Sequence, residues 1–200
     1  MDTGQSSTRR ELLAYGAGIA GAALLVPASA PAAGRAATES EADRLQRLMS
    51  VELLMLYTYR QVMASSLLSP SARRALAPLR ANEEAHIRAL GARLSALGGV
   101  APSPPASVAG ADKALAHREV SGRLGKLKGA KDALRLLLAV ERVTVGAYFV
   151  ALTKLEDPGL ITLAAEIMAN DAQHEAIVGE LLYPGKAGQA VPYGLVQGVQ

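Results

Sequence analysis

One pattern occurs twice in this chain: a glutamate inside an apolar stretch, followed about thirty residues later by carboxylate-x-x-histidine. The spacing between the two acids is 31 residues in the first half and 30 in the second. Residues three apart on a helix project from the same face, so each carboxylate-x-x-histidine can present an oxygen and a nitrogen to one point. The repeat predicts two similar halves that each contribute the same kind of ligand: Glu52, Glu83 and His86 in the first, and Glu141, Asp171 and His174 in the second.

The repeat extends beyond these six residues. In both halves a tyrosine follows the lone glutamate by seven residues (Tyr59 and Tyr148), and an asparagine precedes the second carboxylate (Asn82 and Asn170). Two interpretations of the tyrosines remain open: a supporting or electron-transfer role beside the acids, or core side chains with one hydrogen bond. The asparagines either hold a neighbouring group in place or remain from a duplication.

Apolar residues recur at intervals of three and four along four stretches, which predicts four long amphipathic helices. We expect the first to begin near Glu39, the second to run from Ser69-Pro70 to Gly98-Gly99, the third from about Ala130 to Leu155, and the fourth from Pro158 to about Tyr183. Serine as N-cap and proline at the first helical position are common starts. Pro78 would lie inside the second helix and is expected to kink it, unless that helix begins there.

These helices predict an all-α fold: a four-helix bundle over residues 38–183, made of two antiparallel pairs. The connection over residues 98–129 is long enough to cross the bundle from end to end, and we expect a short helix in it near Asp112 to Gly122. The turn-rich tail over residues 184–200 carries no further signal. On the fourth helix we expect Gln173 and Glu175 to face solvent, as we do Glu84 on the second.

The first 37 residues resemble a twin-arginine signal peptide with a spacer. Thr8-Arg9-Arg10-Glu11-Leu12-Leu13 precedes an apolar run that ends at Pro27, followed by small-residue cleavage sites. The run has about fifteen residues, fewer than the roughly twenty needed to span a bilayer. Export to the periplasm, cell envelope or medium is therefore expected, with an uncleaved N-terminal anchor as the alternative and the only expected contact with a membrane.

Composition excludes several kinds of chemistry. The chain has no cysteine, so it forms no disulfide, iron–sulfur cluster or thiolate nucleophile, and any metal must bind carboxylate and imidazole. Its net charge is +3, and the basic residues are scattered rather than clustered, so we expect no nucleic-acid partner.

Four carboxylates in a core need compensation, because a buried charge without a partner is destabilising by several kcal/mol. Two divalent cations would balance four carboxylates and two neutral imidazoles. Mixed oxygen and nitrogen ligation suits iron or manganese, whereas calcium prefers oxygen alone. The alternative is a bundle without metal, in which the acids pair with arginines such as Arg80, Arg88 or Arg142.

The six residues resemble the ligand set of the ferritin-like superfamily, over about Glu39 to Tyr183. In that superfamily a four-helix bundle holds a di-iron or di-manganese centre with one Glu from each of two helices and Glu-x-x-His from each of the other two. The resemblance implies terminal roles for Glu52 and Glu141, bridging roles for Glu83 and Asp171, and nitrogen ligation by His86 and His174. Position 171 departs from the pattern, because it is Asp where Glu is usual. The chain is most similar to exported bacterial members, a group that includes desiccation-related proteins.

The resemblance implies two iron or manganese ions and an exported dinuclear-metal oxidoreductase that oxidises ferrous iron or acts on peroxide or oxygen. Whether the chain is an enzyme stays open. The alternative is a non-catalytic envelope or stress protein in which metal is structural or absent. Assembly into a homo-oligomer is left open by the sequence.

Overall fold

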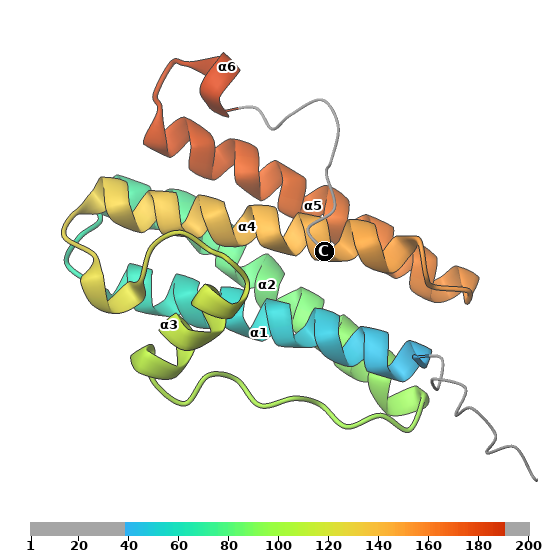
Figure 1. The fold of residues 1–200 in the computed structure, drawn as a ribbon. Helices are drawn as coiled ribbons and strands as arrows, with labels where there is room; N and C mark the ends of the chain where they lie inside the picture. Colours follow the sequence, from blue (N-terminus) through green and yellow to red (C-terminus); the bar gives the residue numbers. More distant parts are fainter. Residues whose placement is uncertain (1–38, 191–200) are drawn as a thin grey trace, which may run out of the picture. The chain divides into compact units, whose positions relative to one another are not determined.

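The computed structural model describes residues 39–190. The predicted signal segment and the end of the tail lie outside this range, so export remains a prediction. The described chain consists of helices and loops: α1 (Glu41–Ala64), α2 (Pro70–Ala96), α3 (Val108–His117), the short 3-10 helix η1 (Leu124–Lys126), α4 (Ala130–Leu152), α5 (Pro158–Leu182) and α6 (Ala187–Ala190). Figure 1 shows the four long helices side by side. The predicted all-α class is confirmed.

Local sequence explains where the long helices begin. Ser40 and Asp43 form a capping box at the start of α1, in which each side chain hydrogen-bonds the backbone N–H of the other. The Ser69 side chain caps α2 and the Asp157 side chain caps α5, and in both helices a proline follows immediately as the first residue. α2 begins at Pro70 and continues through Pro78, which therefore lies inside the helix.

The bundle consists of two helical hairpins, α1 with α2 and α4 with α5. The hairpins meet because α1 packs against α4 and α2 packs against α5 (Figure 1). Two apolar clusters fill the interior. The first contains Leu54 and Met55 of α1, and the second contains Leu45 and Met49 of the same helix. Glu52 lies between them in sequence, and the acids of the other three long helices are flanked in the same way.

The crossover differs in detail from the sequence prediction. Its helix, α3, begins at Val108, because the Ser107 side chain accepts a hydrogen bond from the backbone N–H of Gly110. It ends at His117, shortly before Glu119 takes a positive φ of 57°. Asp112 of α3 accepts hydrogen bonds from the backbone N–H groups of the η1 segment. These bonds hold α3 against η1, and the chain between them is not helical. None of the described helices is both long and apolar enough to cross a membrane.

Two glycines at equivalent positions of the repeat have different surroundings, which gives a stability prediction. A Cβ on Gly179 would lie 2.7 Å from the Ala190 carbonyl oxygen, because α6 packs against α5 there. A Cβ on Gly91 would meet only the flexible end of Met49, at 3.6 Å. We expect Gly179→Ala to lower the free energy of unfolding by about 1–3 kcal/mol through overpacking. Gly91→Ala is expected to raise it by up to about 1 kcal/mol through helix propensity. Urea denaturation of both variants checks this, and equal effects would contradict it.

Candidate metal centre

The structure brings all six predicted residues together in the middle of the bundle. Glu52 lies on α1, Glu141 on α4, and each carboxylate-x-x-histidine lies on the second helix of its hairpin, α2 or α5. The four carboxylate residues are fully buried at 0% exposure, and the two histidines are also buried. Each long helix therefore carries its acid on the face that packs into the core, which is what the apolar periodicity predicts.

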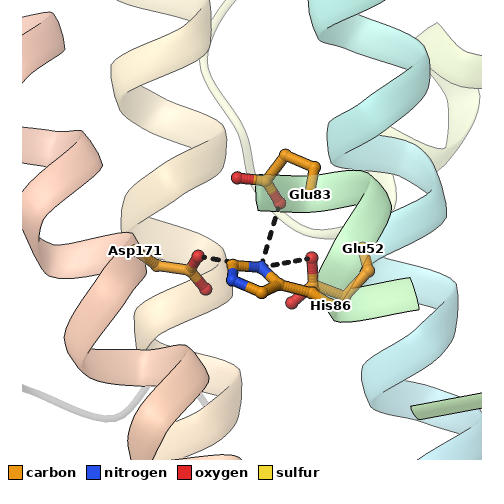
Figure 2. Close-up of side chains that lie close together, drawn as sticks. All are labelled: Glu52, Glu83, His86 and Asp171. Carbon is orange, nitrogen blue, oxygen red and sulfur yellow. Dashed lines mark ion pairs between the residues drawn. The ribbon is translucent and has the colours of Figure 1, made fainter. Parts of the chain in front are cut away.

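The six residues form two overlapping groups whose potential ligand atoms lie within 4.8 Å of one another. One group contains Glu52, Glu83, His86 and Asp171, which Figure 2 shows converging from α1, α2 and α5. The other contains Glu83, Glu141, Asp171 and His174. Glu83 and Asp171 belong to both groups. Glu52 and Glu141 each belong to one group, and the terminal and bridging roles that the resemblance implied stay predictions.

Both imidazoles face the acids with the same nitrogen. Nδ1 of His86 lies 3.6 Å from Oε2 of Glu52, 3.6 Å from Oε2 of Glu83 and 3.5 Å from Oδ1 of Asp171 (Figure 2). Nδ1 of His174 lies 2.8 Å from Oε1 of Glu83, 3.5 Å from Oε1 of Glu141 and 3.8 Å from Oδ1 of Asp171. Each nitrogen thus sits among carboxylate oxygens from three helices.

Most of these inward-facing atoms lack a hydrogen-bond partner. Eight of the eleven buried side-chain nitrogen and oxygen atoms without one, within the described residues, belong to this cluster. They include both oxygens of Glu83, both oxygens of Asp171 and Nδ1 of both histidines; Oε1 of Glu83 and Nδ1 of His174 form a 2.8 Å ion pair rather than a hydrogen bond. A buried polar group left unsatisfied is destabilising by about 1–3 kcal/mol, and more when it is charged. The donor set of carboxylate oxygen and imidazole nitrogen suits a divalent transition metal. The cluster is therefore compatible with a metal site.

The two tyrosines connect the halves of the repeat. The Tyr59 hydroxyl, on α1, donates to Oε1 of Glu141 at 2.5 Å, and the Tyr148 hydroxyl, on α4, donates to Oε1 of Glu52 at 2.6 Å. Both rings are fully buried. Each tyrosine is thus both a core side chain and a direct support for the glutamate of the opposite helix. It occupies one carboxylate oxygen and leaves Oε2 without a hydrogen-bond partner.

The two asparagines support the histidines, again across the repeat. Nε2 of His86 donates to Oδ1 of Asn170 at 3.1 Å, and the Asn82 amide lies 3.1 Å from Nε2 of His174 through its Nδ2 atom. A half-turn of the Asn82 amide would let its oxygen accept from that ring in the same way. These contacts hold both rings with Nδ1 toward the carboxylates. They favour the first of the two interpretations of the asparagines, in which each fixes a neighbouring group.

Burial dominates the electrostatics of the terminal acids. It raises the pKa of Glu52 to about 8 and that of Glu141 to about 7, against the opposing effect of the neighbouring histidines. Burial, together with the nearby glutamates, also raises the pKa of Asp171 well above its usual value. For Glu83 burial acts in the same direction, but its close contacts with His174, His86 and Glu52 outweigh it and lower the pKa to about 2. Glu83 is the most strongly ionised carboxylate of the cluster.

The carboxylates have the opposite effect on the imidazoles. Burial alone would lower the pKa of His86, but Glu52 and Glu83 outweigh it and raise the pKa to about 10. Glu141 and Glu83 likewise outweigh burial at His174 and raise its pKa to about 9. Protons on the histidines therefore balance part of the negative charge in the metal-free protein. A metal ion that binds Nδ1 must displace a proton there.

One surface prediction is wrong. Glu175 is buried, at 4% exposure, and pairs with Arg142 of α4, with Oε2 to Nε at 3.3 Å. Four residues along a helix correspond to a rotation of only about 40°, so Glu175 shares the inward face of Asp171. Gln173, two residues from Asp171, is exposed as predicted, and Glu84 is partly exposed and pairs with Arg60. Arg142, one of the arginines in the metal-free alternative, thus pairs with Glu175, an acid outside the six.

Comparison with known proteins adds a family. No curated protein matches the chain significantly. The model of the ferritin-like domain family matches residues 40–184, a range that begins just before α1 and ends just after α5. This range includes all six residues of the cluster. The chain therefore belongs to the ferritin-like domain family.

Proposed function

We propose that this protein binds two iron or manganese ions in the bundle and uses them in redox chemistry. The observation that carries the proposal is the pair of overlapping buried groups that share Glu83 and Asp171. Glu52 and His86 would hold one ion, Glu141 and His174 the other, and Glu83 and Asp171 would serve both. Two divalent ions would satisfy the inward oxygens and nitrogens that lack hydrogen bonds.

The residues around the cluster have distinct tasks in this proposal. Tyr59 and Tyr148 each hold one oxygen of a terminal glutamate, so that Oε2 is the oxygen available for ligation. Oδ1 of Asn170 accepts a hydrogen bond from the Nε2–H of His86 and so directs the lone pair of Nδ1 toward the acids. The apolar clusters on both sides limit access of water. When bound, iron or manganese supplies electrons for reaction with dioxygen or peroxide.

Redox turnover separates this function from the alternative of a structural envelope or stress protein. Protein loaded with ferrous iron without oxygen, and freed of unbound metal, is mixed with dioxygen or peroxide while ferric absorbance is followed. We expect oxidation faster than that of the same concentration of free iron, and its loss in Glu83→Ala. Iron that stays bound and reduced in the presence of both oxidants would exclude the redox proposal and favour a structural role.

We also propose export through the twin-arginine route, which carries folded proteins. The support is the Arg9-Arg10 motif and the apolar run that follows it, both in residues outside the described range. A chain with both arginines replaced by lysine should remain inside the cell. Export of that variant at the normal level would contradict the proposal.

The aspartate at position 171 gives a further prediction. Asp171 reaches both groups with an arm one methylene shorter than the glutamate that is usual in the family pattern. We expect Asp171→Glu to retain both ions, with equal or tighter binding, because the longer arm keeps the same donor oxygens. Asp171→Asn, which keeps the size but lowers the donor charge, is the matched variant and should bind metal more weakly. Titration with manganese checks both, and complete loss in Asp171→Glu would show that this site requires the short arm.

A further inference from the structure

A cavity lies between α1 and α4, and its lining residues are not those of the carboxylate cluster. It is a cavity of about 770 Å³, which is within the range of small-molecule sites. Leu48 and Val51 of α1 and Ala147 and Ala151 of α4 form its apolar wall. The two alanines lie one turn apart on α4, and their small side chains leave the space between the helices open.

Four basic side chains also line this cavity: Arg44 and Arg47 of α1, Arg118 at the end of α3, and Lys154 just after α4. None of the described residues that line it is acidic or aromatic. Glu39 lies beside Arg44 and Arg47 and pairs with both, so it offsets part of the charge. The cavity still has an excess of positive charge beside an apolar wall.

Two of the guanidinium groups are incompletely partnered within the described chain. Arg118 is partly buried and donates from Nη1 to the Ala114 carbonyl at 3.3 Å, but forms no ion pair with a described residue. Nε of Arg44 is buried without a hydrogen-bond acceptor, and its nearest carboxylate oxygen, on Glu39, is 3.7 Å away. A partly buried cation with unused donors favours an anionic ligand, and the planar guanidinium suits a carboxylate or phosphate.

We propose that this cavity binds a free amphipathic anion: a monomeric aliphatic carboxylate whose head contacts Arg118 and Arg44 and whose chain lies against the wall of leucine, valine and alanine. Alkyl chains fit this wall, because it has no aromatic side chain on which a planar ring could stack. The site shares no residue with the six of the carboxylate cluster. The inference therefore stands apart from the proposed function.

Calorimetric titration of the full chain with octanoate and dodecanoate, both kept below their micelle concentrations, tests the proposal. A buried methylene strengthens binding by about fourfold, so dodecanoate should bind up to about 200-fold more tightly than octanoate. Octyl glucoside, which has an eight-carbon chain but no charge, and inorganic phosphate, which has charge but no chain, should both bind more weakly than octanoate. Equal affinity for octanoate and dodecanoate, or for octanoate and octyl glucoside, would overturn the proposal.

Variants locate the site. Arg118→Gln should weaken dodecanoate binding by about 10- to 100-fold, and Ala147→Leu should also weaken it, because the larger side chain occupies space at the apolar wall. Arg88→Gln and Ala92→Leu, at exposed positions of α2, are the matched controls and should bind as the unchanged protein does. His86→Ala should also bind normally, which separates this site from the metal proposal. Unchanged dodecanoate binding in both Arg118→Gln and Ala147→Leu would refute the proposed anion site. The proposal would also be refuted if the protein sedimented with phosphatidylglycerol vesicles in a way that required Arg118 but did not bind dodecanoate.

Discussion

Replacing Glu83 by alanine is expected to remove both metal ions, whereas replacing Glu52 is expected to remove about one. Glu83 belongs to both groups of potential ligands, and Glu52 belongs to one. Loss of Glu83 also removes the carboxylate that lies closest to Nδ1 of His174, at 2.8 Å. The expected contents are therefore near zero metal ions per chain for Glu83→Ala and near one for Glu52→Ala.

Glu84→Ala is the matched control for this experiment. Glu84 is the next residue on the same helix, but it lies at the surface and pairs with Arg60. Its replacement should leave two ions per chain. Metal content by mass spectrometry, combined with circular dichroism to show that each variant is folded, gives the comparison. Equal metal content in Glu83→Ala and Glu84→Ala would show that the shared carboxylate is not a ligand.

Metal loading is expected to stabilise the folded bundle strongly. The cluster contains four fully buried acids and eight inward atoms without a hydrogen-bond partner, so the metal-free fold carries a cost that bound ions remove. A ligand that binds only the folded state stabilises by about 4 kcal/mol at a free concentration 1,000 times its Kd. Two ions would together raise the free energy of unfolding by about 8 kcal/mol where the free concentration is about 1,000 times the Kd of each binding step.

Thermal unfolding at increasing concentrations of Mn²⁺ measures this effect, and Mn²⁺ is convenient because it is stable in air at neutral pH. The midpoint should rise with metal concentration in the unchanged protein and in Glu84→Ala, but not in Glu83→Ala. Calcium at the same concentrations should have a much smaller effect, because imidazole nitrogen is a poor ligand for it. A midpoint that manganese does not move would mean that the acids are stable in the core without metal.

Much of the fold follows from local sequence. Helix starts at Pro70 and Pro158 were predictable because a capping side chain precedes each proline. The six clustered residues were predictable because each lies on an apolar stripe, and a stripe faces the core whatever the neighbouring helix is. Periodicity therefore places a side chain in the interior, and the repeated spacing indicates which interior side chains meet.

Contacts between distant helices were less predictable. The hydrogen bonds from Tyr59 to Glu141 and from Tyr148 to Glu52 cross the bundle between α1 and α4. Each tyrosine hydrogen-bonds the glutamate of the opposite half of the repeat. The sequence relates each tyrosine only to the glutamate seven residues before it, in its own half. The same holds for the contact of Asn170 with His86.

The position of Arg118 was also not predictable from the sequence. Its position in the cavity depends on how the crossover folds back on α1, which the sequence did not specify. Small residues such as Ala147 fit a helix in many settings, so their role in opening a cavity appears only once α1 packs against α4. Glu175 differs from these cases, since correct use of the helical angle would have placed it inside.

The most direct test of the proposed two-ion centre is the metal content of the mature protein, purified from its own export route without chelators or metal-affinity columns. Inductively coupled plasma mass spectrometry should find about two ions of iron or manganese per chain. Near-zero metal that reconstitution with either ion cannot raise would contradict the account, and would mean that this buried cluster of acids and histidines is maintained without metal.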